Sequence, residues 1–140
     1  LIDNINSLDD NIKSRLTLEN DERGYSVKEL YEVFLKTNVP IVLDTHHHTF
    51  KDDGLNVGQV LELANSTWGK IKQLTHLSNT TPGMESGNFT QKRTHSDYVH
   101  YIPRLQYEAN NLNQIDIDME FKMKNLAIEK AIKEIGEKFK

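Results

Sequence analysis

Cysteine is absent from this 140-residue chain. Disulfide bonds are therefore excluded, and the composition is compatible with a cytoplasmic protein. No run approaches the roughly 18 consecutive apolar residues that a membrane helix requires, so we expect no membrane span. No basic segment followed by an apolar segment opens the chain, so we expect no export signal. The formal net charge of −4 argues against nucleic-acid binding by bulk charge, although a local basic patch is compatible with it.

The apolar residues, 36% of the chain, are clustered and periodic, which is typical of a globular domain or of half of a larger one. Short runs rich in leucine, isoleucine and valine predict strands at about residues 15–20, 41–44, 70–77 and 114–121. Helical periodicity predicts the tail of a helix at 1–13 and further helices at about 26–37, 55–68, 96–109 and 125–139. Ser26 and Glu29 form a capping box, Gly69 ends the next helix, and Pro103 should kink or break the one after it.

Alternation of strands and helices predicts a parallel sheet with crossover helices, in one partial domain that spans residues 1–140. Half of an eight-unit barrel and a small doubly wound sheet both have this content. In the last strand Asp116, Asp118 and Glu120 share one face, because successive side chains alternate. Three acids are costly to bury under helices, whereas a barrel lumen near a catalytic mouth can pair them with metal or lysine. We therefore expect a half barrel.

Carboxylates and imidazoles recur where the predicted strands end. They are Glu19 in the tetrad Glu-Asn-Asp-Glu, Asp44 with His47, then His76, and finally Glu120. Residues of these types from several βα loops indicate one metal site. Carboxylates suit Mn²⁺ or Mg²⁺, and histidine shifts the preference towards Mn²⁺ or Zn²⁺. In an extended segment His46 and His48 would point away from His47, so at most one of the three histidines is expected to bind metal.

Four segments resemble motifs of the UV damage endonuclease family, in the same order and spacing. They are Arg15 to Glu22, which resembles the family's LENDE motif, Leu43 to His48, which resembles its D-x-HHH motif, Thr75 to Ser78, and Asp118 to Lys124. The resemblance runs from about Arg15 to Lys133. It implies a TIM (β/α)8 barrel, related to endonuclease IV and the xylose isomerases, with a cluster of divalent metals, usually manganese, at its mouth.

The resemblance also implies an activity, namely nicking of damaged double-stranded DNA immediately 5′ to UV photoproducts. By motif, Glu19 would come from the fifth barrel strand, Asp44 and His47 from the sixth, His76 from the seventh and Glu120 from the eighth. The chain would thus be the C-terminal half of the barrel. Glu19 and His76 are also expected to be catalytic.

A basic loop before the third complete helix is expected to face DNA. Lys92 and Arg93 supply the positive charge that a phosphate backbone requires, and the resemblance implies that His95 contacts a phosphate.

The chain departs from the family in two respects. Leu74 stands two residues before His76, where the family usually has a lysine that would line the site. The family's remaining histidine ligands and damage-probing residues lie in the N-terminal half. Three interpretations follow: the chain is a fragment of a longer protein, it has lost activity, or two half barrels assemble into one. A half barrel leaves unpaired strand edges, so we expect self-association or a partner that supplies the other half.

Two alternatives stay open from the sequence. A metal-dependent sugar isomerase or epimerase would use similar ligands on the same type of barrel. A folded remnant would keep the scaffold and weak metal binding without activity.

Overall fold

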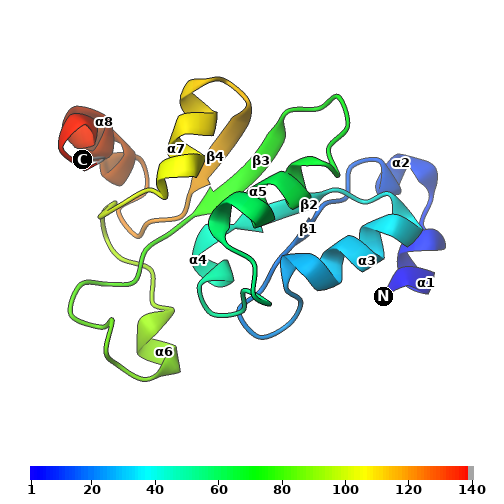
Figure 1. The fold of residues 1–140 in the computed structure, drawn as a ribbon, viewed down its shortest axis with the longest axis horizontal. Coiled ribbons are helices and arrows are strands. Elements are labelled where there is room, and N and C mark those ends of the chain that lie inside the picture. The colour runs from blue at the N-terminus through cyan, green and yellow to red at the C-terminus, as the bar shows by residue number, and fades with distance from the viewer. Residues whose placement is uncertain (139–140) are drawn as a thin grey trace.

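The computed structural model describes the backbone of residues 1–138 and the side chains of residues 1–134. Its core is a four-stranded parallel sheet in the order β1-β2-β3-β4 (Figure 1). The strands are β1 (Leu18–Glu19), β2 (Ile41–Asp44), β3 (Gln73–Leu77) and β4 (Ile115–Met119). Within the described residues each strand pairs only with its neighbours in sequence, as successive units of a barrel do, which confirms the predicted α/β class.

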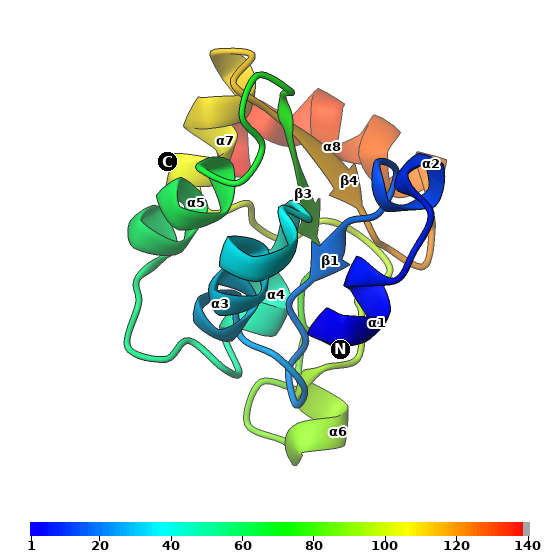
Figure 2. The ribbon, with the colours of Figure 1, turned by 90° about the vertical axis from the view of Figure 1, so that its right-hand side faces the viewer.

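Eight helices are described, several of them only one turn long. They are α1 (Ile2–Asn6), α2 (Asp10–Lys13), α3 (Val27–Thr37), α4 (Thr45–His48), α5 (Val57–Asn65), α6 (Phe89–Lys92), α7 (Arg104–Asn111) and α8 (Asn125–Lys138). Helices α3, α5 and α7 lie on one side of the sheet (Figures 1 and 2). None of these described helices is both long and apolar enough to cross a membrane.

Two apolar clusters fix the helices to the sheet. In the first, Leu30 of α3 and Val60 of α5 pack with Ile41 and Leu43 of β2. The second joins α8 to the far end of the sheet, and it contains Leu77, Val99, Ile102, Phe121, Ala127 and Ala131. Burial of these side chains contributes about 25 cal/mol per Å² of apolar area, which is the main favourable free energy that holds the helices against the sheet.

The opposite face of β4 is polar and open. Asp116 and Asp118 are exposed, while Ile115 on the helix side is buried. The predicted alternation of acids on one face is therefore present. Lys72 Nζ lies 2.7 Å from Asp116 Oδ1 and is the acid's ion-pair partner. This acidic face is the one that a closed barrel would turn inward.

The strands are shorter than predicted at their amino ends. The amides of Arg15 and Leu16 donate to the carbonyls of Ile12 and Lys13, so the first predicted strand begins with a turn. The amide of Ile71 likewise donates to Trp68, and β3 begins only at Gln73. Backbone groups engaged in turns cannot also join the ladder, which is why these strand starts were predicted wrongly.

Helix ends follow local signals where tertiary contacts do not intervene. Ser26 and Glu29 form the predicted capping box of α3, and Asn56 with Gln59 forms another at α5. Helix α8 begins at the predicted Asn125. Its predicted last residue, Phe139, and the side chain of Ile135 lie outside the described residues.

The predicted helix at 96–109 is wrong in its first half. Residues 96–103 are not helical, and α7 begins at Arg104, directly after Pro103. The side chain of the buried Asn79 accepts hydrogen bonds from the amides of His100 and Tyr101, at 2.7 and 3.1 Å. Because these amides are taken by a distant loop, and because a residue before proline disfavours helix, the segment stays extended.

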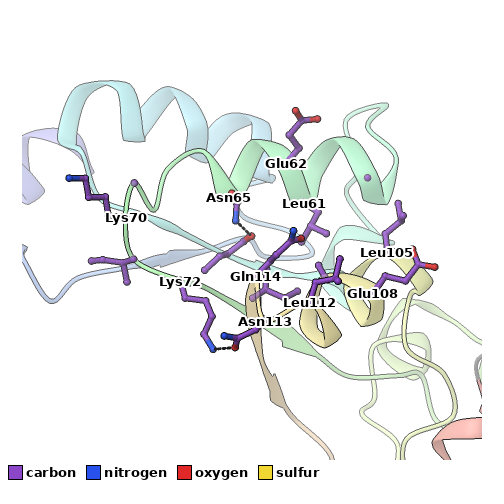
Figure 3. Close-up of a pocket in the computed structure, with 16 residues that line it drawn as sticks. Leu61, Glu62, Asn65, Lys70, Lys72, Leu105, Glu108, Leu112, Asn113 and Gln114 are labelled. Carbon is purple, nitrogen blue, oxygen red and sulfur yellow. Dashed lines mark hydrogen bonds between the residues drawn. The ribbon is translucent and has the colours of Figure 1, made fainter.

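A cavity of about 740 Å³ lies between α5 and α7 (Figure 3). Leu61, Leu105 and Leu112 form part of its wall, and Lys72 and Asn113 stand where β3 and β4 begin. The ligand-type residues of the sequence stand at the opposite, carboxyl ends of the strands. The cavity is therefore separate from the candidate site described next.

Candidate metal centre

Asp44, the last residue of β2, shapes the histidine-rich segment that follows it. Its side chain is fully buried, and Oδ1 accepts hydrogen bonds from the amides of His46 and His47, at 2.7 and 2.8 Å. Asp44 thus caps α4, a single helical turn that contains all three histidines. The expectation of an extended histidine segment is wrong, because the cap turns the chain immediately after the strand.

Asn20 ties the first strand to the second beyond their backbone ladder. Its side-chain amide donates to the carbonyl of Asp44 at 3.0 Å and accepts from the amide of Asp44 at 2.8 Å. The carbonyl of Asn20 lies 2.9 Å from Nδ1 of His47. This buried amide therefore places Glu19, its neighbour in sequence, beside the end of β2.

The structure brings all five predicted ligand residues together. Nδ1 of His47 lies 3.5 Å from Glu19 Oε1 and 3.8 Å from Asp44 Oδ2. Nδ1 of His76 lies 3.2 Å from Glu19 Oε1 and 3.4 Å from Glu120 Oε1. Two groups could each hold a metal ion, with their ligand atoms within 4.8 Å of one another: Glu19, Asp44 and His47, and Asp44, His76 and Glu120. Asp44 belongs to both.

Two atoms at the centre of this cluster lack the partners that burial requires. Asp44 Oδ2 and His76 Nδ1 are buried and have no hydrogen-bond partner among the described residues. Glu19 Oε1 is close to His76 Nδ1 but does not meet the geometry of a hydrogen bond. Unpartnered buried polar atoms are rare and costly, whereas a carboxylate oxygen and an imidazole nitrogen are good ligands for divalent cations. The donor set of three carboxylates and two imidazoles therefore fits a divalent metal.

The electrostatic environment of the two ligand-type histidines favours positive charge. The Glu19 carboxylate raises the pKa of His76 despite the opposing effect of burial, and Glu120 and Asp44 add to the increase. Burial lowers the pKa of His47, but Asp44, the Asn20 carbonyl, Glu22 and Glu19 together raise it above its ordinary value. A site that attracts protons in this way also attracts metal cations.

His46 and His48 lie outside the two candidate metal groups. His46 is buried, which lowers its pKa, and its ring packs edge-on to Phe50 at 5.1 Å between centroids. His48 Nε2 lies 2.9 Å from the carbonyl of Leu55. His46 Nε2 is buried and has no hydrogen-bond partner among the described residues. Of the three histidines, His47 is the one that lies within 4 Å of carboxylate oxygens, those of Glu19, Glu22 and Asp44.

Glu22 is a residue of the site to which the sequence reasoning gave no role. Its side chain is 7% exposed, and Oε2 lies 3.6 Å from Nε2 of His47. The turn at Asp21, whose side chain accepts from the amides of Arg23 and Gly24, brings Glu22 back towards α4. The Glu-Asn-Asp-Glu tetrad predicts a functional segment. Its sequence does not show which of the acidic side chains the turn directs into the site.

The loop with the predicted DNA-facing residues contacts this site. Arg93 Nη1 pairs with Oε1 of Glu22, and Lys92 is the last residue of α6. The ring of His95 lies 6.0 Å from that of His46, between centroids. His95 is not in either candidate metal group of the described residues.

Leu74 is half-buried in β3, in register with Asp116 of β4. Lys72, two residues earlier, is held by Asp116 at 2.7 Å and by Asn113 Oδ1 at 3.0 Å. Its ammonium group is therefore directed to the amino end of the sheet, where it cannot replace a charge beside His76.

Comparison with known proteins gives a consistent match over nearly the whole chain. The model of a family described as UV-endonuclease UvdE matches residues 1–139. A UV DNA damage endonuclease of Nostoc sp. is 37% identical over 134 residues, which cover 91% of this chain and 38% of the relative. A UV DNA damage endonuclease of Bacillus cereus is 31% identical over 139 residues, with coverages of 96% and 42%. A UV-damage endonuclease of Schizosaccharomyces pombe is 35% identical over 108 residues, with coverages of 71% and 18%.

The crystal structure of SacUVDE, a TIM-barrel-type enzyme, superposes with a TM-score of 0.76 at 28% identity. The match covers 97% of this chain and 44% of SacUVDE. Together with the four-stranded parallel sheet, it identifies the fold as a partial barrel. The chain spans about two fifths of the length of the Nostoc and Bacillus relatives.

Proposed function

Because this chain belongs to the UV-endonuclease UvdE family, we propose that it is the C-terminal, metal-holding half of a DNA repair endonuclease. Its substrate is double-stranded DNA with UV damage, and the reaction is hydrolysis of the phosphodiester bond immediately 5′ to the photoproduct. The observation that supports this most strongly is the cluster of five ligand-type side chains at the strand ends, with two buried and unpartnered ligand atoms. The relatives reported above are named as UV damage endonucleases, and none of them is named as a sugar isomerase.

Glu19, Asp44, His47, His76 and Glu120 would hold the divalent metal ions, for which Mn²⁺ fits best and Zn²⁺ or Mg²⁺ are the alternatives. When bound, such ions activate a water molecule and neutralise the charge that develops on the phosphate. The buried Asp44, common to both groups, would hold them close together.

Glu19 and His76 are our proposed catalytic residues. Glu19 Oε1 stands between the two histidines, 3.5 Å from Nδ1 of His47 and 3.2 Å from Nδ1 of His76. Without metal, the carboxylate stabilises a proton at Nδ1 of His76, as the raised pKa of that histidine reflects. Both side chains line the cluster that the scissile phosphate would approach.

Lys92, Arg93 and His95 would contact the DNA backbone, because cationic side chains supply most of the sequence-independent affinity for phosphates. The loop that carries them reaches the metal-site residues through Arg93 and Glu22. The other partner is the rest of the barrel, since β1 and β4 each pair with only one strand of the described sheet. Further strands of the same polypeptide, a second polypeptide or a second copy of the chain would cover these edges.

The test is nicking of supercoiled plasmid in the presence of Mn²⁺, with the chain alone and with the remaining barrel strands of the Nostoc relative supplied as a second polypeptide. We expect nicked circles from UV-irradiated plasmid and none from unirradiated plasmid. Glu19→Gln, which keeps the shape and removes the charge, should abolish nicking. If no combination nicks irradiated plasmid, the proposed endonuclease function of these residues is contradicted.

A further inference from the structure

Glu22 is a nearly buried carboxylate outside the five proposed metal ligands, with a side chain that is 7% exposed. A carboxylate at such a position loses most of its hydration, and it is tolerated only if nearby groups compensate its charge. Two such groups are present, one for each carboxylate oxygen, and they belong to different parts of the site. The contacts of Glu22 therefore indicate a specific role.

The first contact is with the proposed ligand His47. Nε2 of the His47 ring lies 3.6 Å from Glu22 Oε2, and Nδ1 on the other side of the ring faces Glu19 and Asp44. A ring with one nitrogen towards a metal site and the other towards a carboxylate has the arrangement that commonly fixes the tautomer and orientation of metal-binding histidines. In this structure Nδ1 donates to the carbonyl of Asn20 at 2.9 Å, so a metal ion that binds Nδ1 displaces that proton. The carboxylate of Glu22 keeps the proton on Nε2 when this happens.

The second contact is with the loop that carries Lys92, Arg93 and His95, here called the Arg93 loop. Oε1 of Glu22 accepts from Arg93 Nη1, one residue after α6. Helix α6 makes a further contact with the same segment, because the guanidinium of Arg23 lies 4.7 Å from the ring centroid of Phe89. Phe89 also packs against Phe50 at 5.5 Å between centroids. These contacts hold the loop against Glu22 and Arg23, which follow β1.

We propose that Glu22 is a positioning residue that holds His47 with Nδ1 towards the metal and ties the Arg93 loop to the metal centre. This inference rests on the proposed metal site. A single carboxylate would then position both the metal ligand His47 and Arg93, the cationic side chain that is proposed to contact the DNA backbone. DNA that draws Arg93 away from Glu22 would change the surroundings of His47 in the same step.

The test compares Glu22→Gln with Glu32→Gln, a control that removes the same charge from an exposed position on α3. Mn²⁺ affinity of the 140-residue chain is measured by titration calorimetry, with circular dichroism to verify the fold. We expect Glu22→Gln to bind Mn²⁺ about 10- to 100-fold more weakly, the usual effect of removing a partner of a metal-binding histidine. Glu32→Gln should bind like the unsubstituted chain.

Two spectroscopic measurements separate positioning from a general structural role. In the unsubstituted, Zn²⁺-loaded chain, ¹⁵N-labelled histidine should show a slowly exchanging proton on Nε2 of His47. Amide hydrogen exchange of residues 88–94 should accelerate in Glu22→Gln and equally in Arg93→Gln, but not in Glu32→Gln. The first measurement needs no variant, so it decides the matter even if Glu22→Gln fails to fold.

Mn²⁺ affinity within twofold of the unsubstituted chain in a folded Glu22→Gln variant would overturn the proposal. In the Zn²⁺-loaded chain, a His47 proton on Nδ1, or one on Nε2 that exchanges with solvent at the rate of a free imidazole, would do the same. Failure of the metal site itself has a different signature. In that case neither the unsubstituted chain nor Glu32→Gln binds Mn²⁺ or Zn²⁺, and the role of Glu22 falls with it.

Discussion

At the scale of single residues, Asp44 shows how one side chain serves both the fold and the site. Oδ1 caps α4, and Oδ2 is buried without a hydrogen-bond partner, 3.8 Å from Nδ1 of His47. The motifs predict five ligand-type residues at strand ends, and the structure brings these five side chains together. Glu22 was not identified, because its inward direction depends on the turn at Asp21 and on Arg93, which is distant in sequence.

The raised pKa values of His47 and His76 lead to a pH dependence of metal binding. Both values lie above the ordinary histidine value of about 6.5 in the metal-free protein, so protons compete with metal for both rings. We expect Mn²⁺ affinity to rise steeply as the pH increases through neutrality, with protons released on binding. Calorimetry in buffers of different ionisation enthalpy measures that release.

The stability of the metal-free protein should change in the opposite direction. A group whose folded pKa is raised contributes stability that is fully present below its unfolded pKa and is lost as the pH rises through the folded pKa. Metal-free chain should therefore lose stability from about pH 6.5 upward, and added Mn²⁺ should restore it. Affinity that is flat between pH 6 and 8 would show that neither histidine binds the metal.

At the scale of elements, local signals determined the parts of the fold that tertiary contacts leave alone. The capping box of Ser26 and Glu29 placed the start of α3 correctly. The helix predicted from residue 96 failed because the side chain of Asn79, from a distant loop, binds the amides of His100 and Tyr101. The predicted strand starts were wrong where turns use the backbone amides that a strand would need for its hydrogen bonds. Neither kind of contact is visible in the periodicity of a single sequence.

Asn20 provides a test of how the sheet supports the site. Its side chain makes two buried hydrogen bonds with the backbone of Asp44, and Asn20→Ala leaves both backbone groups unsatisfied. We expect the free energy of unfolding to fall by about 2–6 kcal/mol, from about 1–3 kcal/mol for each of the two buried groups that lose their partner. Urea denaturation measures this, with the exposed Asn4→Ala as control. Equal effects of the two substitutions would contradict the role of Asn20.

At the scale of the whole molecule, the chain is a partial barrel with helices on one side and acids on the open face of β4. The alternation of acids in the last strand predicted that open face. The absence of a neighbour on the outer sides of β1 and β4 within the described sheet leaves backbone groups for another strand.

These edges and the open face should make the isolated chain associate. We expect sedimentation velocity to show dimers or larger species whose proportion rises with protein concentration, since each added copy covers an edge. Mixing with the complementary strands of the Nostoc relative should replace these species by a one-to-one complex. A stable, monodisperse monomer at all concentrations would contradict the need for a partner.

Metal content tests the central claim most directly. Protein purified without an affinity tag or chelator is analysed by plasma mass spectrometry beside Glu19→Ala and the exposed control Glu32→Ala. The account predicts near-stoichiometric manganese or zinc in the unsubstituted chain and in the control, and a large loss in Glu19→Ala. Absence of metal from the unsubstituted chain, or the same metal content in Glu19→Ala, would contradict a metal centre at these strand ends.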